Sequence, residues 1–272
     1  MSIIPIFICD MQSVLFNDIY KKYHFDEEPA FVVTREVLYA NDTLLVSSSS
    51  QNLQRLLDAV VHEGAKYGLE LNWNKTFQMA VGSTGSIARP GGGVIEKKEN
   101  VVYLGGLISC DGKTTRELTR RISEGHGVFK SLCKLWAHSG ITPKRKLLLF
   151  NAYVRSKVLY SLASLWLLKA DKTRIDAFQC YCVRRIMRVA PSFISRVSND
   201  EVLESASQVR FSKSIEVCQR QLYCKIHLLL NAFVRKLVCE NDGQPKSWFT
   251  RRSRGRPRQR WATEVFKMIV LA

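Results

Sequence analysis

Four consecutive residues, Tyr39-Ala40-Asn41-Asp42, place an amide beside a carboxylate where a pair of carboxylates would support metal-dependent phosphate chemistry. Two adjacent aspartates could hold two divalent cations about 3.5 to 4 Å apart on opposite sides of a reacting phosphate. Asn41 offers a carbonyl oxygen without charge, so it should bind Mg²⁺ less well than an aspartate would. Asn-Asp is also a common turn dipeptide for local hydrogen-bonding reasons, so the tetrad alone leaves both interpretations open.

The flanking residues predict a hairpin with this tetrad at its tip. Residues 31–33 and 37–38 form one β-favouring run and residues 44–46 form another, with Asn41-Asp42 as a tight turn between them. A helix should follow, because apolar residues recur at helical spacing. These residues are Leu53, Leu56, Leu57, Val60 and Val61.

Further motifs follow the predicted helix. They are Gly-Leu-Glu-Leu-Asn-Trp-Asn-Lys-Thr at 68–76, Val-Tyr-Leu-Gly-Gly at 102–106 and Asp-Gly at 111–112. This succession, at these distances, resembles the reverse transcriptase of non-long-terminal-repeat (LINE-type) retrotransposons. In that family Tyr-Ala-Asp-Asp lies at the palm hairpin, Gly-Leu-x-x-Asn-x-x-Lys-Thr follows, and Tyr-Leu-Gly begins the primer grip.

The resemblance implies roles for individual residues. Asp42 would be a catalytic metal ligand and Asn41 a degenerate ligand position, so the Mg²⁺ that the family implies would bind weakly or not at all. Lys75 would lie near the incoming triphosphate, where it could neutralise charge or protonate the leaving pyrophosphate, and the family context favours this ancestry over the alternative of a surface lysine after a turn. The primer grip would comprise Tyr103, Leu104 and Gly105.

The family activity is RNA-directed DNA polymerisation, but we expect this chain to be a truncated and catalytically impaired remnant that retains nucleic-acid binding. Residues 5–8 and 14–18 resemble the helix that follows the family's template-contacting motif, although the glycines of that motif are absent. The family's other catalytic aspartate lies in an earlier strand, and nothing ahead of Met1 supplies it. Asn41→Asp alone should therefore not restore synthesis.

We predict an α+β fold, in which a partial polymerase palm of small antiparallel sheet and helices precedes an all-helical thumb-like region. The palm would span residues 1–112, with strands near 75–81 and 101–108 and a Gly-rich loop between them. The thumb-like region would span residues 113–190, and further helices residues 191–240. Residues 241–272 would form a basic linker and tail that ends in a short helix.

The net charge of +17 is distributed unevenly. Residues 1–112 hold 9 basic and 13 acidic side chains, residues 113–188 hold 17 and 4, and residues 189–272 hold 15 and 7. Such an excess can serve solubility alone. Here it coincides with helices that already have an apolar side, which favours salt-sensitive, sequence-independent binding to RNA or DNA.

Three helices should carry this charge. The first has apolar residues at helical spacing from Leu118 to Trp136, the second should begin at Thr142-Pro143, and Asp171 could cap the third. Residues 198–201 have the spacing of a capping box for another helix. The residues expected to contact nucleic acid are Arg120, Arg121, Lys130, Lys134, Lys144, Arg145, Lys146, Arg254, Arg256 and Arg258.

The last three arginines belong to a basic segment, residues 251–260, that contains six arginines in ten residues. Its core, Arg-Gly-Arg-Pro at 254–257, is similar to the AT-hook, which binds the minor groove of A/T-rich DNA. A basic nuclear-localisation-like stretch with no further role is the alternative.

The eight cysteines lack Cys-x-x-Cys spacing, and the sequence has no apparent signal peptide or membrane-length apolar run. We therefore expect reduced thiols in an intracellular protein, nuclear or cytoplasmic, with no membrane partner. Cys218, Cys224, His227 and Cys239 are spaced more widely than a retroelement zinc knuckle, and burial in a helix explains Cys218 better. We do not expect zinc.

Three hypotheses of function compete. The chain could be an active polymerase, a polymerase remnant that binds nucleic acid, or a basic helical module without polymerase ancestry that binds nucleic acid or an acidic protein. The ordered motifs favour the first two hypotheses, and Asn41 favours the second over the first. The oligomeric state is open.

Overall fold

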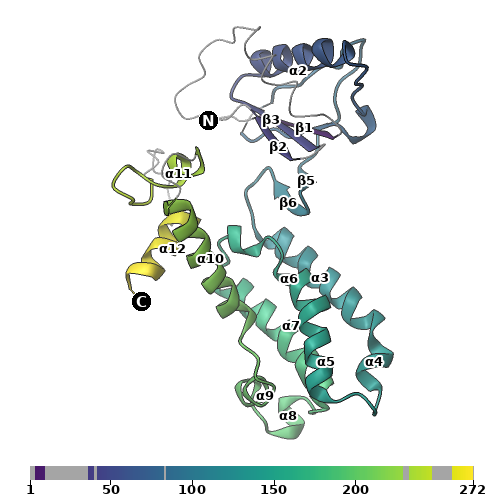
Figure 1. Cartoon of the computed structure of the whole chain (residues 1–272), viewed down its shortest axis with the longest axis vertical. Helices are drawn as coiled ribbons and strands as arrows, with labels where there is room; N and C mark the ends of the chain where they lie inside the picture. Colours follow the sequence, from purple (N-terminus) through teal and green to yellow (C-terminus); the bar gives the residue numbers. More distant parts are fainter. Residues whose placement is uncertain are drawn as a thin grey trace. The chain divides into compact units, whose positions relative to one another are not determined.

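The computed structural model describes residues 4–9, 36–39, 42–82, 84–228, 233–246 and 259–271. The fold is α+β, which confirms the predicted class. The chain divides into two compact units, Met1–Lys113 and Thr114–Ala272, whose elements are labelled in Figure 1. We call them the N-terminal unit and the helical unit. Among the described helices, none combines the length and the apolar character that a membrane crossing requires.

A four-stranded antiparallel sheet forms the centre of the N-terminal unit, in the order β2-β3-β1-β4. Side chains of the inner strand β3 alternate between the two faces of the sheet, so Leu45 packs against one apolar cluster and Leu44 against another. The strands are β1 Ile4–Cys9, β2 Glu36–Tyr39, β3 Asp42–Ser47 and β4 Phe77–Gln78.

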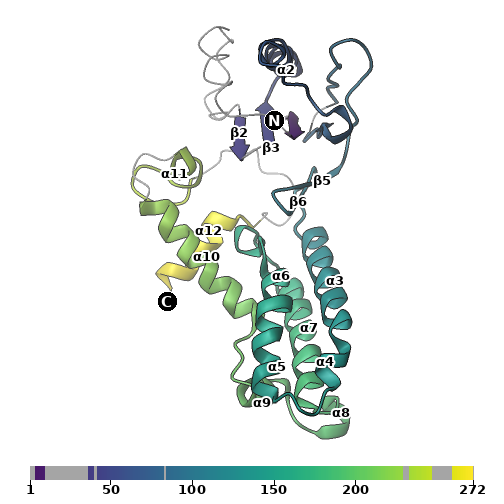
Figure 2. The ribbon, with the colours of Figure 1, turned by 45° about the vertical axis from the view of Figure 1, so that its right-hand side comes forward.

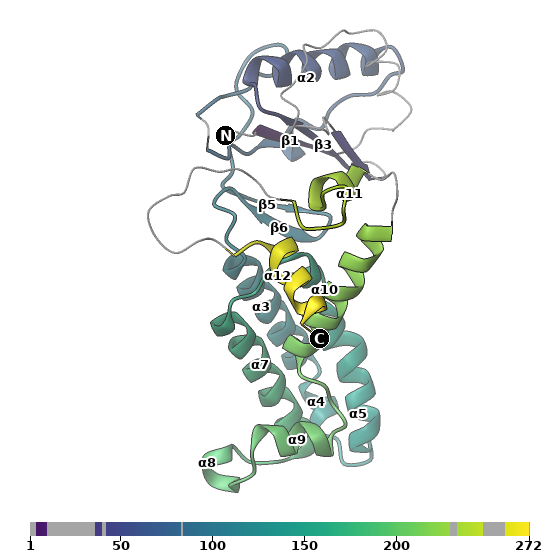
Figure 3. The ribbon, with the colours of Figure 1, turned by 90° about the vertical axis from the view of Figure 1, so that its left-hand side faces the viewer.

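Helix α2, Ser50–Ala65, lies along one face of this sheet (Figure 3). It begins after Ser49, whose hydroxyl accepts a hydrogen bond from the backbone N–H of Asn52. Its apolar side packs with Leu45, which confirms the helix predicted from the spacing of the apolar residues. The buried residues of that side include Leu53, Leu56, Leu57 and Val60.

The helix predicted at residues 5–8 is wrong, because these residues belong to strand β1. Ile4, Ile6 and Ile8 alternate along the strand, and β-branched residues suit a pleated sheet. Antiparallel partners on both sides of β1 then satisfy its backbone groups. Residues 14–18 and 31–33 lie outside the described residues.

The strand predicted near 101–108 is a hairpin of two strands, β5 Asn100–Tyr103 and β6 Gly106–Ser109. Leu104 and Gly105 connect them with positive φ angles of 48° and 77°. Two consecutive residues of this kind are typical of the primed turn that joins two-residue hairpins. The reversal therefore divides the predicted strand at its middle.

The segment between β4 and β5 is fastened by the side chain of Gln78, which is fully buried. Its amide nitrogen donates to the carbonyl of Ile95 at 2.6 Å, and its amide oxygen accepts from the backbone N–H of Ile87 at 3.1 Å. Ile87 and Ile95 are buried in the same cluster as α2. One buried amide thus replaces ladder hydrogen bonds that a longer strand would make, and β4 is shorter than predicted.

The helical unit has a large apolar core, with α3, α5 and α7 side by side (Figure 2), and a smaller apolar cluster around Tyr223, Cys239 and Val265. Phe129 and Trp136 stack with ring centroids 5.2 Å apart, and Phe150 and Phe211 stack at 6.0 Å. Its elements are α3 Thr115–Ser131, α4 Cys133–Ala137, α5 Pro143–Leu149, η2 Phe150–Arg155, α6 Ser156–Leu159, η3 Leu162–Ser164, α7 Lys169–Met187, α8 Ser192–Ser195, α9 Asn199–Ser205, α10 Phe211–Leu228, α11 Phe233–Val238 and α12 Trp261–Val270.

Two of the predicted helix starts are confirmed. Thr142 caps α5, with Pro143 in its first turn, and Ser198 forms a capping box with Glu201 at α9. The predicted cap at Asp171 is wrong, because α7 begins at Lys169 and Asp171 is a buried residue of its first turn. A carboxylate remains favourable there, since it lies near the positive end of the helix dipole.

Candidate functional site

Asp42 is the first residue of β3 and lies opposite both neighbouring strands. It pairs with Tyr39 of β2 on one side and with Cys9 of β1 on the other, and its side chain is half-buried. The connecting residues Ala40 and Asn41 lie outside the described residues. Asp42 therefore belongs to the sheet, because it pairs with Tyr39. The sequence had predicted a turn at Asn41-Asp42, so the strand begins at the last residue of the predicted turn.

Lys75 and Asp42 flank the same end of strand β1. Lys75 is the exposed last residue of η1, Trp73–Lys75, just before β4. β4 runs antiparallel to β1, so the residues that precede β4 lie toward the end of β1 at Cys9. Cys9 is also the residue opposite Asp42. The strand order thus brings together two predicted site residues that are far apart in the sequence.

The turn that delivers Lys75 depends on Gly68, whose φ of 70° favours glycine. The next residue, Leu69, donates its backbone N–H to the carbonyl of Gly64 at 3.0 Å, which closes the end of α2. Thr76 then donates its hydroxyl to the carbonyl of Asn72 at 2.9 Å. Gly68, Asn72 and Thr76 of the motif at 68–76 therefore have local structural roles.

The donors that the structure describes do not fit a two-metal centre. No group of three or more His, Cys, Asp or Glu side chains that could hold a metal ion occurs in the described ranges. Asp42 contributes a carboxylate at the start of β3, and the preceding residue, Asn41, carries an amide. We therefore derive no reaction step through a metal.

The order of strands and motifs in the N-terminal unit has a counterpart in a known family. Residues 5–108 match the family model of the reverse transcriptase (RNA-dependent DNA polymerase). This reverse-transcriptase segment runs from β1 to β6 and includes Asp42, Lys75 and the β5–β6 turn. Reverse transcriptases generally use divalent metal ions and bind nucleic acid. No curated protein shows a significant match to the chain.

The three residues predicted as a primer grip lie at the tip of the β5–β6 hairpin in the reverse-transcriptase segment. Tyr103 and Leu104 are half-buried and Gly105 is exposed. Leu104 adopts a left-handed conformation that costs a residue with a Cβ atom about 1 to 2 kcal/mol. The hairpin therefore presents a strained backbone at the position where the resemblance expects a contact with the primer.

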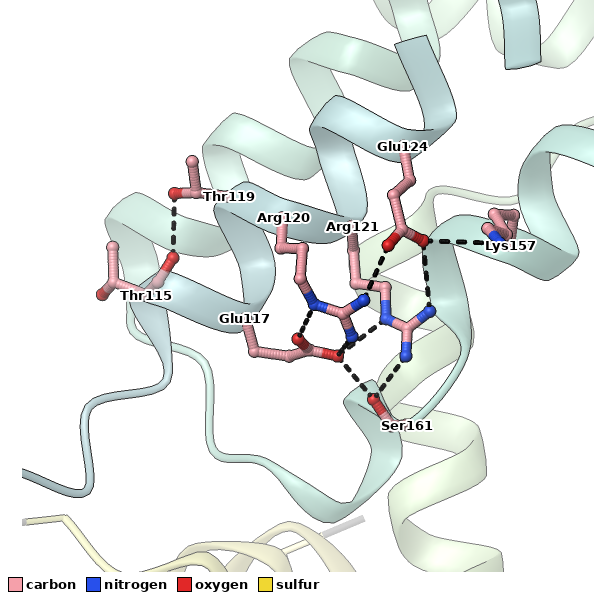
Figure 4. A network of polar contacts seen from close by, with 8 residues as sticks. All are labelled: Thr115, Glu117, Thr119, Arg120, Arg121, Glu124, Lys157 and Ser161. Atoms are coloured by element: carbon pink, nitrogen blue, oxygen red, sulfur yellow. Dashed lines mark hydrogen bonds and ion pairs between the residues drawn. The ribbon is translucent and has the colours of Figure 1, made fainter. Parts of the chain in front are cut away.

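In the helical unit, Arg121 is buried in a network of ion pairs around Glu117 (Figure 4). Glu117 accepts hydrogen bonds from Arg121 Nε at 2.7 Å, from Arg120 Nε at 2.7 Å and from the Ser161 hydroxyl at 3.0 Å. Glu124 pairs with Arg120 and also with Lys157. Burial alone would raise the pKa of Glu117, but these hydrogen bonds outweigh it and hold the pKa below its usual range.

Arg121 and Lys146 were predicted to contact nucleic acid, but both side chains are buried, at 3% and 2% exposure. Arg121 is held by Glu117, and Lys146 donates to the carbonyl oxygens of Trp136 and His138 at 2.7 Å each. A phosphate could reach either cation only after these contacts are broken. Helical periodicity had not distinguished them from surface cations, since long side chains can extend beneath a neighbouring element. Arg120 is half-buried in the same network.

Six exposed cations gather at one end of the helical unit, which we call the basic end. Lys146 ties the first turn of α5 to the end of α4, and Arg188 ties the end of α7 to α4 by donating to the carbonyl of Ala137 at 3.0 Å. Within the described ranges, none of the six forms an ion pair with a carboxylate. The six cations of the basic end are Lys130, Lys134, Lys144, Arg145, Arg185 and Arg188.

Arg185, Arg188 and Tyr181 are not among the residues that the sequence predicted to contact nucleic acid. Arg185 donates to the hydroxyl of Tyr181 at 3.0 Å, and its guanidinium lies 5.7 Å from the ring centroid. An aromatic residue four positions before an arginine on a predicted helix was the signal available in the sequence.

The remaining predictions concern the arginines of the basic tail and the cysteines. Arg254, Arg256 and Arg258 lie outside the described residues. The burial predicted for Cys218 is wrong, because Cys218 is exposed on α10, as is Cys224. Cys239 is buried and its thiol lies 3.7 Å from the hydroxyl of Tyr223.

Proposed function

We propose that this chain derives from a LINE-type reverse transcriptase, binds nucleic acid through its helical unit, and polymerises DNA weakly or not at all. The order of the motifs from Asp42 to Asp111 supports the LINE assignment, with the N-terminal unit as palm and the helical unit as thumb. The amide at Asn41 supports weak polymerisation, because an uncharged oxygen replaces an anionic ligand for magnesium.

The observation that carries nucleic-acid binding is the basic end. Elsewhere in the helical unit, the carboxylates of Glu117 and Glu124 are paired with Arg120, Arg121 and Lys157. The cations of the basic end have no such partners among the described residues. A polyanion that binds there would release its counterions without displacing an internal ion pair.

Two of these cations occupy a position that does not favour the helix. Lys144 and Arg145 lie in the first turn of α5, where the positive end of the helix dipole disfavours cations. Helix stability therefore does not account for them, whereas a nearby phosphate would offset the repulsion. This observation favours an external anion over a purely structural role.

Binding is tested by the fluorescence anisotropy of a labelled DNA duplex across a salt series. The purified chain should bind at low salt and lose affinity steeply as the salt concentration rises. A variant with Lys130, Lys134, Lys144 and Arg145 changed to alanine should bind less tightly. Its plot of log affinity against log salt should be shallower by about 0.9 per lost phosphate contact.

The matched control is Lys225→Ala, since Lys225 is an exposed lysine on α10 outside the basic end. It should leave the salt dependence close to that of the unmodified chain. Binding that does not depend on salt, or an equal effect of the control, would contradict the proposal. Tight binding to polyglutamate without binding to nucleic acid would favour an acidic protein partner instead.

Polymerase activity is tested by primer extension on an RNA template with Mg²⁺. We expect little or no product from the unmodified chain. Robust synthesis would refute the proposed impairment while leaving the family assignment intact.

A further inference from the structure

A groove opens at the basic end where α3, α4 and α7 meet, with a volume of about 790 Å³. Four aromatic rings line it, those of His126, Phe129, Trp136 and Tyr181. Among its described lining residues there are also three cations and no carboxylate. The volume is within the range of sites that hold single small ligands, about 300 to 1,000 Å³.

We propose that this groove holds an unpaired base of a single-stranded nucleic acid. The base stacks on Tyr181, and the adjoining phosphates lie on Lys130, Arg185 and Arg188. This inference rests on the proposed function, nucleic-acid binding, and specifies a form of the ligand that the basic end alone does not select.

Tyr181 is positioned for stacking yet remains accessible, since 44% of it is exposed. Its ring centroid lies 5.7 Å from that of His126 and 6.1 Å from that of Phe129, and Arg185 holds its hydroxyl. These contacts restrict the ring without covering it. A preorganised aromatic surface loses little conformational freedom when a base stacks on it.

Gly127 supports the groove independently, because packing does not require a glycine there. A Cβ atom at Gly127 would meet nothing within 4 Å, whereas one at Gly125, two residues earlier in α3, would lie 2.3 Å from Val158. Glycine inside a helix is about 1 kcal/mol less favourable than alanine. Close packing therefore explains Gly125, whereas Gly127 lines the groove at a position where packing would allow a side chain.

The chemistry of the lining favours a single strand over a duplex or an acidic peptide. Bases in a duplex are stacked inside it, so a duplex would offer the groove phosphates but no base face. An acidic peptide would pair with the cations without filling the space between aromatic rings. A single strand supplies both an anionic backbone and exposed aromatic faces.

The test compares a labelled oligothymidylate, the same oligonucleotide with abasic sites, and a duplex of equal length. Tyr181→Leu removes the ring, and Gly127→Leu adds a bulky side chain to the lining of the groove, at a position where a Cβ atom meets nothing within 4 Å. Both variants should bind oligothymidylate at least about fivefold less tightly, as expected for one lost base stack, and should bind the duplex within about twofold of the unmodified chain. The matched control is Tyr153→Leu, at an exposed tyrosine of η2 outside the groove.

In the unmodified chain the abasic strand should bind more weakly than oligothymidylate, and in Tyr181→Leu the two should bind equally. Affinities of both groove variants equal to that of the unmodified chain would overturn the inference, and so would equal binding of the abasic strand. If the unmodified chain bound no nucleic acid at all, the proposed function would fail as well, so the two failures are distinguishable.

Protection of a native thiol tests the same groove without a substitution. Cys133 lines the groove and is exposed, and Cys224 is exposed on α10 outside it. Oligothymidylate should slow the alkylation of Cys133 by iodoacetamide and leave that of Cys224 unchanged, as measured by peptide mass spectrometry. Equal rates at Cys133 with and without the strand would overturn the inference even if both variants failed to fold.

Discussion

The ammonium of Lys146 lies 2.7 Å from the backbone carbonyl oxygen of Trp136. It lies equally close to the carbonyl of His138, so one buried cation serves two carbonyl groups at the end of α4, one within the helix and one at its C-cap. The last carbonyls of a helix have no intrahelical donors, and positive charge is favoured beside them. Lys146 is therefore a structural residue that holds α5 against α4, and it positions the neighbouring cations Lys144 and Arg145.

Lys146→Met should lower the free energy of unfolding by about 2 kcal/mol, because it removes a charged donor and leaves buried carbonyls without a partner. Urea denaturation measures this change. Lys144→Met is the matched control, since Lys144 is exposed, and its effect on stability should stay within about 0.5 kcal/mol. Equal stability losses in the two variants would contradict the structural role of Lys146.

Glu117→Gln should destabilise the chain at pH 7 by about 3 kcal/mol, because it removes the nearer of two carboxylates that pair with the buried guanidinium of Arg121, the other being Glu124 at 3.5 Å. The folded-state pKa of Glu117 is lowered, so its contribution to stability is present above the unfolded-state pKa and is lost as the pH falls through the folded value. The gap between variant and unmodified chain should therefore narrow below about pH 4.3.

Thermal denaturation across a pH series measures that gap. Glu204→Gln, at an exposed carboxylate of α9, is the control and should give no gap at any pH. A gap for Glu117→Gln that did not change with pH would show that the lost stability does not depend on the charge of Glu117.

Gly125→Ala and Gly127→Ala should change stability in opposite directions. The added methyl at Gly125 would lie 2.3 Å from Val158 and 3.1 Å from Phe178, and overpacking of this kind costs about 1 to 3 kcal/mol. At Gly127 the methyl meets nothing, so the higher helix propensity of alanine should stabilise by up to about 1 kcal/mol. Chemical denaturation compares the two variants, and a shared direction of change would contradict the packing described for α3.

Asn41→Asp should strengthen the binding of Mn²⁺ by about tenfold, because it adds a second anionic ligand next to Asp42. Electron paramagnetic resonance of free Mn²⁺ measures the change. Adding Asp42→Asn to this variant should return the affinity to that of the unmodified chain. The prediction fails if the unmodified chain already binds Mn²⁺ as tightly as Asn41→Asp.

Much of the local structure could be predicted from the sequence, because it depends on neighbouring residues. The apolar spacing of α2, the cap at Thr142 and the capping box at Ser198 are of this kind. The helix predicted at residues 5–8 failed, because a short apolar run suits either structure and the strands on both sides of β1 decided between them.

The sequence by itself determined the order of motifs, the amide at Asn41 and the concentration of positive charge in the C-terminal two thirds of the chain. Only the tertiary structure decided which cations are exposed. Arg121 and Lys146 are buried by contacts with Glu117 and with the end of α4, whereas Arg185 remains exposed beside a groove that three helices form together. The reason is physical: charge is a property of each residue, but burial and pairing depend on the elements that pack around it.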